Sequence, residues 1–298
     1  MEIFKLYDPT HMVNIAALLP LRSELGAKWD FGRLLVICGS SAMPGAALMA
    51  CGSALRSGVG LVELAAVRDV TTAAVLRHPE CILTPLTGED GAICPADLPT
   101  FSRPLQRASA LLCGCGLGAG AAQADFLRAL LPTLTIPSVL DADALNLLAQ
   151  APELLHQARV PWVLTPHVVE FHRLSGLPVE DIEADPIETA SAFAVHHNVV
   201  VVLKGSTTTV ANPNGGFWQL EALNSGMAKG GSGDVLAGLI AGFLAQGCSP
   251  YHSAILGVYL HALAGDLARQ ELGMRAMLPT DVISHLGKAF RLVTEACR

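Results

Sequence analysis

The amino-acid sequence predicts an α/β protein in three layers, with one doubly wound, mostly parallel sheet and helices on both of its faces. Short runs of Val, Leu and Ile alternate along the chain with helical stretches rich in small residues, as in parallel sheets that are buried on both sides. Glycine-rich loops follow several of these runs, as they do where a parallel strand leads into a helix. Hydrophobic residues make up 51% of the chain and aromatic residues only 5%, which suits close packing of helices on a sheet.

The predicted elements follow in order from apolar runs bounded by turn residues. Strands are expected at residues 33–38, 60–67, 81–84, 108–113, 137–140, 162–165 and 199–203, and segments 207–211 and 217–220 form a hairpin across the turn 212–216. Helices are expected at residues 46–57, 69–77, 144–150, 168–175, 186–197, 235–246, 250–270 and 280–296, with another running from the loop 114–120 to residue 131. We treat residues 1–298 as a single domain in which residues 1–30 form an N-terminal arm.

Charge and composition exclude several classes of function. The net charge is −7 and no basic stripe is visible, which disfavours a nucleic-acid-binding protein. No apolar run reaches the roughly 18 residues of a membrane span. The first residues lack the basic and apolar regions of a signal peptide, so we expect a cytoplasmic protein. The eight cysteines are scattered, which indicates reduced thiols in a cytosolic core, with a zinc site at the CxC of Cys113 and Cys115 as a minor alternative.

The most informative segment is the turn Gly230, Gly231, Ser232, Gly233 and Asp234, which leads directly into an apolar helix. Free backbone N–H groups and the helix dipole make such a turn an anion hole. A carboxylate there would repel phosphate unless it has a chemical task, and Asp234 fits the task of taking a proton from a hydroxyl that attacks a phosphate. The same residues also fit an ordinary helix start with Ser232 or Asp234 as its capping residue.

A second phosphate-binding candidate follows the Val- and Leu-rich strand 199–203. Lys204 and Gly205 come directly after this strand, and residues 206–208 add three hydroxyl groups. Such a group can bind phosphate oxygens, although a solvated strand end has the same pattern. His261 and Asp266 lie inside the expected helix 250–270 and are interpreted as structural residues.

The loop that follows the strand 108–113 carries Gly114, Gly116 and Gly118. Three glycines at every second position indicate a backbone that approaches a ligand or a neighbouring segment of chain closely. Their spacing is not that of a dinucleotide-binding GxGxxG loop, and no acidic partner for a ribose lies at the usual distance. The loop 39–45, also rich in Gly and Ser, could wrap a substrate or be an ordinary turn.

Acidic residues and one histidine follow two other strands. His167 and Glu170 are three residues apart and share one face of the next helix. Glu170 could hold a metal through water or interact with the helix N-terminus, and a lone His167 is often structural. Asp141 and Asp143 could bind a metal or anchor a loop, and spacing does not decide between these roles.

Six motifs, taken in this order, resemble those of the ADP-dependent NAD(P)H-hydrate dehydratase family, a branch of the ribokinase-like fold. They are MPGAA at 43–47, GxGLG at 114–118, DADAL at 141–145, TPHxxE at 165–170, KGxxT at 204–208 and NxGxAxGGxGDxLxG at 224–238. The resemblance implies a hydro-lyase that repairs the S epimers of hydrated NADH and NADPH (NADHX and NADPHX). ADP phosphorylates the added hydroxyl, and loss of phosphate returns NAD(P)H with release of AMP and phosphate.

The resemblance also implies roles for individual residues. Asp234 is the implied base on the hydrate hydroxyl, and Mg²⁺ is the implied ion between the phosphates, with Glu170 as a water-mediated ligand. The implied substrate contacts are Ala46, Gly116, Gly118, His167 and Asp234. The implied ADP site consists of Lys204, Gly205, Ser206, Thr207, Thr208 and Gly233.

The sequence departs from the family pattern near the expected substrate mouth. Val168 and Val169 replace the frequent Pro-Gly, Cys115 stands where proline is usual, and Trp29 replaces a glycine. The alternatives are a ribokinase-like small-molecule kinase acting on a vitamin precursor or sugar hydroxyl, and a nucleotide-binding regulator without catalysis. Relatives often carry an epimerase domain for which this chain is too short, so a separate NAD(P)HX epimerase is expected. The apolar surplus suggests a homo-oligomer, with a tetramer expected.

Overall fold

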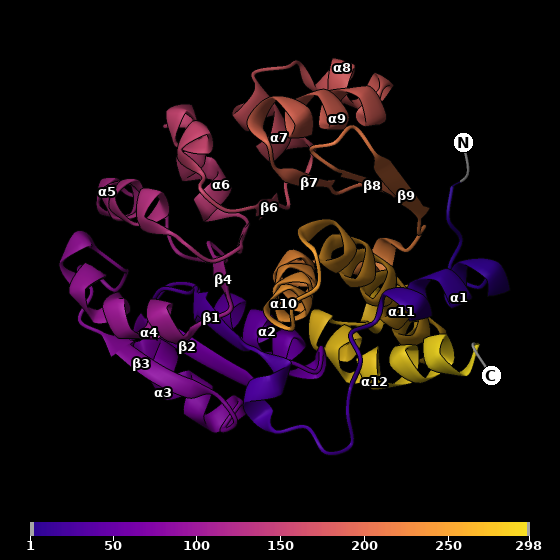
Figure 1. The fold of residues 1–298 in the computed structure, drawn as a ribbon, viewed down its shortest axis with the longest axis horizontal. Helices are drawn as coiled ribbons and strands as arrows, with labels where there is room; N and C mark the ends of the chain where they lie inside the picture. Colours follow the sequence, from indigo (N-terminus) through magenta and orange to yellow (C-terminus); the bar gives the residue numbers. More distant parts are fainter. Residues whose placement is uncertain (1–2, 297–298) are drawn as a thin grey trace.

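Among residues 3–296, which the computed structural model describes, nine strands form one sheet at the centre of the molecule (Figure 1). They span Arg33–Ile37 (β1), Leu61–Val67 (β2), Ile82–Leu86 (β3), Ala110–Cys113 (β4), Ser138–Leu140 (β5), Trp162–Leu164 (β6), Val200–Leu203 (β7), Thr207–Ala211 (β8) and Phe217–Glu221 (β9). Their order is β3-β2-β1-β4-β5-β6-β7-β8-β9. All pairs from β3 to β7 are parallel, and only the pairs made by β8 are antiparallel. This sheet confirms the predicted mostly parallel, doubly wound topology.

Helices cover both faces of this sheet (Figure 1). One face packs against Pro9–Leu18 (α1), Pro44–Arg56 (α2), Arg68–Arg77 (α3), Ser232–Ala245 (α10), Pro250–Ala276 (α11) and Pro279–Glu295 (α12). The other packs against Ser102–Arg107 (α4), Ala121–Leu130 (α5), Asp143–Leu148 (α6), Val168–Ser175 (α7), Val179–Ala184 (α8) and Pro186–His197 (α9). Short 3-10 helices span Lys28–Phe31 (η1), Pro95–Phe101 (η2), Leu131–Thr133 (η3), Pro152–Gln157 (η4) and Ser225–Met227 (η5).

The central strand β1 shows why the strands read as continuous apolar runs. Leu34 and Val36 belong to the core on the α2/α10 face, whereas Leu35 and Ile37 belong to the core on the opposite face. Successive side chains of a strand point to opposite faces, so a strand covered on both sides favours apolar residues at consecutive positions. All four side chains are fully buried, and each contributes roughly 1.5–3 kcal/mol of hydrophobic stabilisation.

Glycines let α10 lie unusually close to α2. A Cβ atom at Gly238 would stand 2.1 Å from the carbonyl oxygen of Ala50 and 2.3 Å from Ser53 Oγ. One turn later, a Cβ at Gly242 would stand 2.1 Å from Ser57 Oγ. The small-residue pattern of both helices is therefore a requirement of their packing, and this packing fixes where α10 begins.

The N-terminal arm is more ordered than its sequence indicates. It contains α1, and Phe4 pairs with the edge strand β9: its N–H donates to the carbonyl oxygen of Gln219 at 3.0 Å, and its own carbonyl accepts from Glu221 N–H at 3.3 Å. The sequence reading also missed η2, α4 and α8, which are short and carry no clear apolar periodicity. It ended the long helix at residue 270, whereas α11 continues to Ala276 and contains a non-helical Gly273.

Within residues 3–296, no helix combines the length and apolar character that crossing a membrane requires. The seven cysteines of this part of the chain are free thiols, in agreement with the prediction. The eighth, Cys297, lies outside the described residues.

The α2–α10 contact predicts the effect of Gly238→Ala. The added methyl group overlaps α2 backbone, so we expect a loss of about 1–3 kcal/mol in the free energy of unfolding, measured by denaturant titration. Gly287→Ala in α12 is the matched control: no atom lies within 4 Å of its added Cβ, and it should be neutral or stabilising by up to ~1 kcal/mol. Equal losses in both variants would contradict the packing argument.

Candidate active site

The strand order reverses between β1 and β4, which is where ligands bind in open α/β sheets. The loops that follow these two strands are joined by a hydrogen bond of 2.8 Å from Gly39 N–H to the carbonyl of Cys115. Gly116 has a φ of +62°, and a Cβ on it would stand 2.7 Å from the Cβ of Ala46. The structure thus brings together two of the residues predicted to contact substrate, at the expected edge of the sheet.

Asp143 forms a hydrogen bond with the backbone of the glycine loop at Gly118. The Gly118 N–H donates to Asp143 Oδ2 at 2.8 Å, so Asp143 anchors the glycine loop. A Cβ on Gly114 would stand 2.0 Å from the carbonyl oxygen of Asp141, which explains the first glycine of the loop. The close approaches recorded at Gly114 and Gly116 are to neighbouring segments of the chain itself.

Side chains that follow β5, β6 and β7 form a buried ionic group. Lys204 Nζ lies 3.0 Å from Asp141 Oδ1 and 3.6 Å from Glu170 Oε2. Thr165 Oγ1 donates to the same Asp141 oxygen at 2.7 Å. Burial by itself lowers the pKa of Lys204, but the carboxylates of Asp141 and Glu170 outweigh it and leave the pKa above its ordinary value. Lys204 is therefore a cation at neutral pH, and 20% of its side chain is exposed.

The glycine turn meets this lysine at the start of α10. Its Gly231 has a φ of +104° and packs against Met49, so a side chain there would be strained. A Cβ on Gly233 would stand 3.5 Å from Lys204 Nζ. First-turn amides of a helix have no carbonyl partner within the helix, so they and the lysine converge on one place. The predicted anion hole therefore has its cation beside it.

Lys229, which the sequence reading overlooked, holds this turn in place. Its Nζ donates to the carbonyl oxygens of Arg275, at 2.8 Å, and Met277, at 2.5 Å, and thereby ties the turn to the residues at the end of α11. The lysine immediately before Gly230 was the only signal in the sequence.

The environment of Asp234 raises the pKa of its carboxyl group. Burial, followed by the nearby charge of Asp141, raises its pKa to about 6, although Cys115 and Lys204 act in the opposite direction. One ligand-type atom each from Cys115, Asp141 and Asp234 lies within 4.8 Å of the others. A carboxylate with a pKa near 6 accepts protons far better than an ordinary aspartate while remaining largely ionised at neutral pH.

His167 and Glu170 form the start of α7. His167 Nδ1 accepts hydrogen bonds from the N–H groups of Val169 and Glu170, and Glu170 Oε2 accepts from His167 N–H at 2.8 Å. The backbones of His167 and Lys204 also form an isolated parallel β-bridge. The Glu170 carboxylate is thus buried and engaged by one hydrogen bond from His167 N–H and by the Lys204 ion pair at 3.6 Å, whereas half of the His167 side chain is exposed.

A pocket of about 1200 Å³ opens beside this group and is bounded by β7–β9, the glycine turn and α11. Of the predicted nucleotide site, it is lined by Lys204, Gly205, Ser206, Thr208 and Gly233, together with His167 and Ser232. Thr207, Ala46, Gly116, Gly118, Gly230, Gly231 and Asp234 are not part of its lining. The residues predicted to hold the nucleotide and those predicted to hold the hydrate therefore lie in largely separate places that meet at Gly233 and Asp234, except that His167, a predicted hydrate contact, lines the nucleotide pocket.

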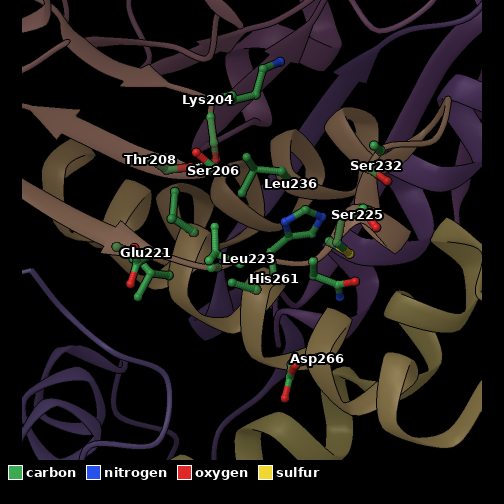
Figure 2. Close-up of a pocket in the computed structure, with 18 of the residues that line it drawn as sticks. Lys204, Ser206, Thr208, Glu221, Leu223, Ser225, Ser232, Leu236, His261 and Asp266 are labelled. Atoms are coloured by element: carbon green, nitrogen blue, oxygen red, sulfur yellow. Dashed lines mark hydrogen bonds between the residues drawn. The ribbon is translucent and has the colours of Figure 1, made fainter. Parts of the chain in front are cut away.

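His261 and Asp266, which were interpreted as structural residues, also line this pocket. Figure 2 shows Lys204 and Asp266 at opposite ends of the view, with His261 between them. Burial lowers the pKa of His261 to about 4, so its ring is neutral. Their helical positions gave no indication of this, because only the packing of α11 against the glycine turn places them in the pocket.

The N-terminal segment forms one wall of the same pocket through Leu6 and Tyr7. The Tyr7 hydroxyl donates to Asp266 Oδ2 at 2.7 Å. Burial, and then Asp266, raise the pKa of Tyr7 to about 12. Tyr259 OH donates to the carbonyl of Leu6. Nothing in the sequence of the arm indicated this role.

The raised pKa of Asp234 predicts a pH-dependent stability. A folded-state pKa near 6, against about 4 in the unfolded chain, means that the proton favours folding. This stabilisation is complete below about pH 4 and is lost as the pH rises through 6. Asp234→Asn removes the buried charge, so between pH 4 and 7 it should gain about 1–2 kcal/mol in unfolding free energy relative to the parent.

Denaturant titrations at several pH values check this expectation. The control is Asp125→Asn, which removes a negative charge from a side chain that is 64% exposed. The same pH dependence in both variants would show that Asp234 does not lie in the environment described.

Comparison with known proteins agrees with this geometry. A family model described as NAD(P)H-hydrate dehydratase matches residues 34–288. The ADP-dependent (S)-NAD(P)H-hydrate dehydratase of Xanthomonas campestris pv. campestris is 35% identical over 88% of this chain and 89% of its own. The bifunctional NAD(P)H-hydrate repair enzyme of Moorella thermoacetica is 38% identical over 93% of this chain, which spans about half (52%) of that relative.

A solved structure of the same family is also similar to this protein. The ADP/ATP-dependent NAD(P)H-hydrate dehydratase of Bacillus subtilis, co-crystallised with ATP and Mg²⁺, has a TM-score of 0.81 and 29% identity, with 98% of this chain and 99% of that chain covered. The overall fold is thus shared along nearly the whole length of both chains. The protein belongs to the NAD(P)H-hydrate dehydratase family and has its ribokinase-like fold.

Proposed function

We propose that this protein catalyses the ADP-dependent dehydration of the S epimers of hydrated NADH and NADPH. The products are NADH or NADPH, AMP and phosphate. The observation that carries the proposal is the meeting of Asp234, Lys204 and the first turn of α10 beside the pocket of about 1200 Å³. A base, a cation and a set of amides around one point are the groups that phosphoryl transfer requires.

In this proposal ADP occupies the pocket with its β-phosphate at the start of α10. The amides of Gly230, Gly231 and Gly233 and the charge of Lys204 would stabilise the negative charge of the transferring group, whereas the Ser232 N–H already donates to the Lys229 carbonyl at 3.2 Å. Ser206, in the turn between β7 and β8, and Thr208, in β8, would add hydroxyl donors, whereas Thr207 does not line the pocket. The hydrate would lie at the switch point beside Ala46, Gly116, Gly118 and His167, with its hydroxyl directed at Asp234.

The chemistry follows in two steps. Asp234 takes the proton from the hydroxyl as that oxygen bonds to the β-phosphorus of ADP, and the bond from this phosphorus to the bridging oxygen breaks and releases AMP. The ring-nitrogen lone pair then expels phosphate together with the hydroxyl oxygen, and loss of a proton from the adjacent carbon restores the double bond. The phosphate is a better leaving group than hydroxide, so the protein contributes mainly positioning and electrostatics.

Mg²⁺ fits the oxygen-rich donor set around Lys204, because Asp141, Glu170 and Asp234 supply carboxylates and a nucleotide supplies phosphate oxygens. When bound, the ion would neutralise charge on the transferring phosphate. Glu170 is already engaged by His167 N–H and Lys204, so we propose that it holds the ion through water.

The proposal extends to the protein's partners. The curated relatives of about twice this length are named as bifunctional repair enzymes, which supports pairing with an NAD(P)HX epimerase that converts the R epimer. A homo-oligomer, expected to be a tetramer, remains a proposal supported by the large exposed side chains of Leu21, Leu25 and Leu76. We also propose a cytoplasmic location, where its nicotinamide substrates arise.

The proposal predicts that absorbance in the reduced-nicotinamide band rises when the protein is mixed with NADH hydrate, Mg²⁺ and ADP. Asp234→Asn should abolish turnover, by at least about 10³-fold, while ADP still binds in calorimetry. The control Asp125→Asn should turn over at the parent rate. An absorbance rise only with ATP would contradict the assignment of ADP as the phosphoryl donor. No rise with either nucleotide, on folded protein, would favour a small-molecule kinase. Near-parental turnover of Asp234→Asn would exclude Asp234 as the base.

A further inference from the structure

Three histidines cluster near the N-terminal ends of β6 and β7, whereas the candidate active site lies at the C-terminal ends of the strands. His156 lies near the end of η4, and His196 and His197 are the last two residues of α9. The ring centroids of His196 and His197 are 4.6 Å apart, and those of His156 and His197 are 5.0 Å apart. One nitrogen from each ring lies within 4.8 Å of the other two. Three imidazoles from two separate elements thus face a common point.

The chemistry of His197 favours a ligand rather than a purely packed ring. Its Nδ1 is buried and has no hydrogen-bond partner within the described residues, which is a costly arrangement for a polar atom. The ring packs on Phe193, with centroids 4.3 Å apart.

We propose that His156, His196 and His197 bind a divalent transition-metal ion of the Zn²⁺ class, with water completing the coordination shell. Neutral imidazole nitrogens suit Zn²⁺, Ni²⁺ and Cu²⁺, whereas Mg²⁺ prefers oxygen ligands. Zinc–nitrogen bonds of about 2.0–2.1 Å require the three nitrogens to approach one another more closely. His156 and His196 are exposed, so their rings can rotate to do this.

The position of the cluster gives the metal a structural task. His197 precedes β7, whose roughly 13 Å of strand ends at Leu203 beside Lys204. The ion would join η4 to the end of α9, two elements that the chain connects only through β6, α7 and α8. It would therefore brace the layer that holds β7, at a distance from the reacting groups, and the inference is independent of the repair activity proposed above.

The test uses the full-length protein without a polyhistidine tag, freed of metal by a chelator that is then removed. Zn²⁺ titrated by calorimetry should bind with one high-affinity equivalent and raise the melting temperature. His156→Gln and His196→Gln, both at exposed positions, should each weaken this binding at least about tenfold. The matched control His252→Gln, also exposed, should bind like the parent.

Side-chain NMR provides a second readout that does not depend on a folding comparison. One equivalent of Zn²⁺ should shift the imidazole resonances of His156, His196 and His197 and leave those of His252 unchanged. Equal Zn²⁺ affinities for the parent and the His156→Gln and His196→Gln variants, or shifts confined to other histidines, would overturn the proposal.

Discussion

The ion pairs of Lys204 are the interaction on which the rest of the site depends. Asp141, Glu170 and Lys204 come from the ends of different elements, and their contacts of 3.0 and 3.6 Å fix β5, α7 and β7 relative to one another. Two buried carboxylates around one cation would leave excess negative charge if the lysine were removed. The same lysine lies beside the first turn of α10, so one side chain both connects the ends of these elements and places a positive charge at the predicted anion hole.

In this arrangement, neighbouring groups act on the pKa of Asp234 in opposite directions. Burial and Asp141 raise its pKa to about 6, and Lys204 restrains that rise. A carboxylate in such a position destabilises the fold at neutral pH, which is the usual sign that a residue is kept for chemistry. Glycines at 238 and 242 contribute indirectly, because they allow the close contact of α2 with α10, the helix whose first turn carries Asp234.

The sequence was sufficient for the sheet and for the position of the glycine turn at the start of α10, because their signals are local; phosphate binding by this turn stays a prediction. Pure Val and Leu runs, such as 200–203, mark buried strands, and the glycine turn marks the start of α10. It was insufficient for Tyr7, Lys229, His261 and Asp266, whose roles depend on which distant segments meet. The arm reaches β9 through Phe4, and α11 lies against the glycine turn. Neither contact has a periodic or spacing signal in the sequence.

The most direct test of the proposed chemistry follows the oxygen of the added hydroxyl. NADH hydrate labelled with ¹⁸O at this hydroxyl is mixed with the protein, Mg²⁺ and ADP, and the products of one turnover are examined by ³¹P NMR and mass spectrometry. Transfer to the hydroxyl before elimination predicts one ¹⁸O in the inorganic phosphate for each NADH and AMP formed. Label found in water, with unlabelled phosphate, would contradict the account, because the hydroxyl would then have left without being phosphorylated.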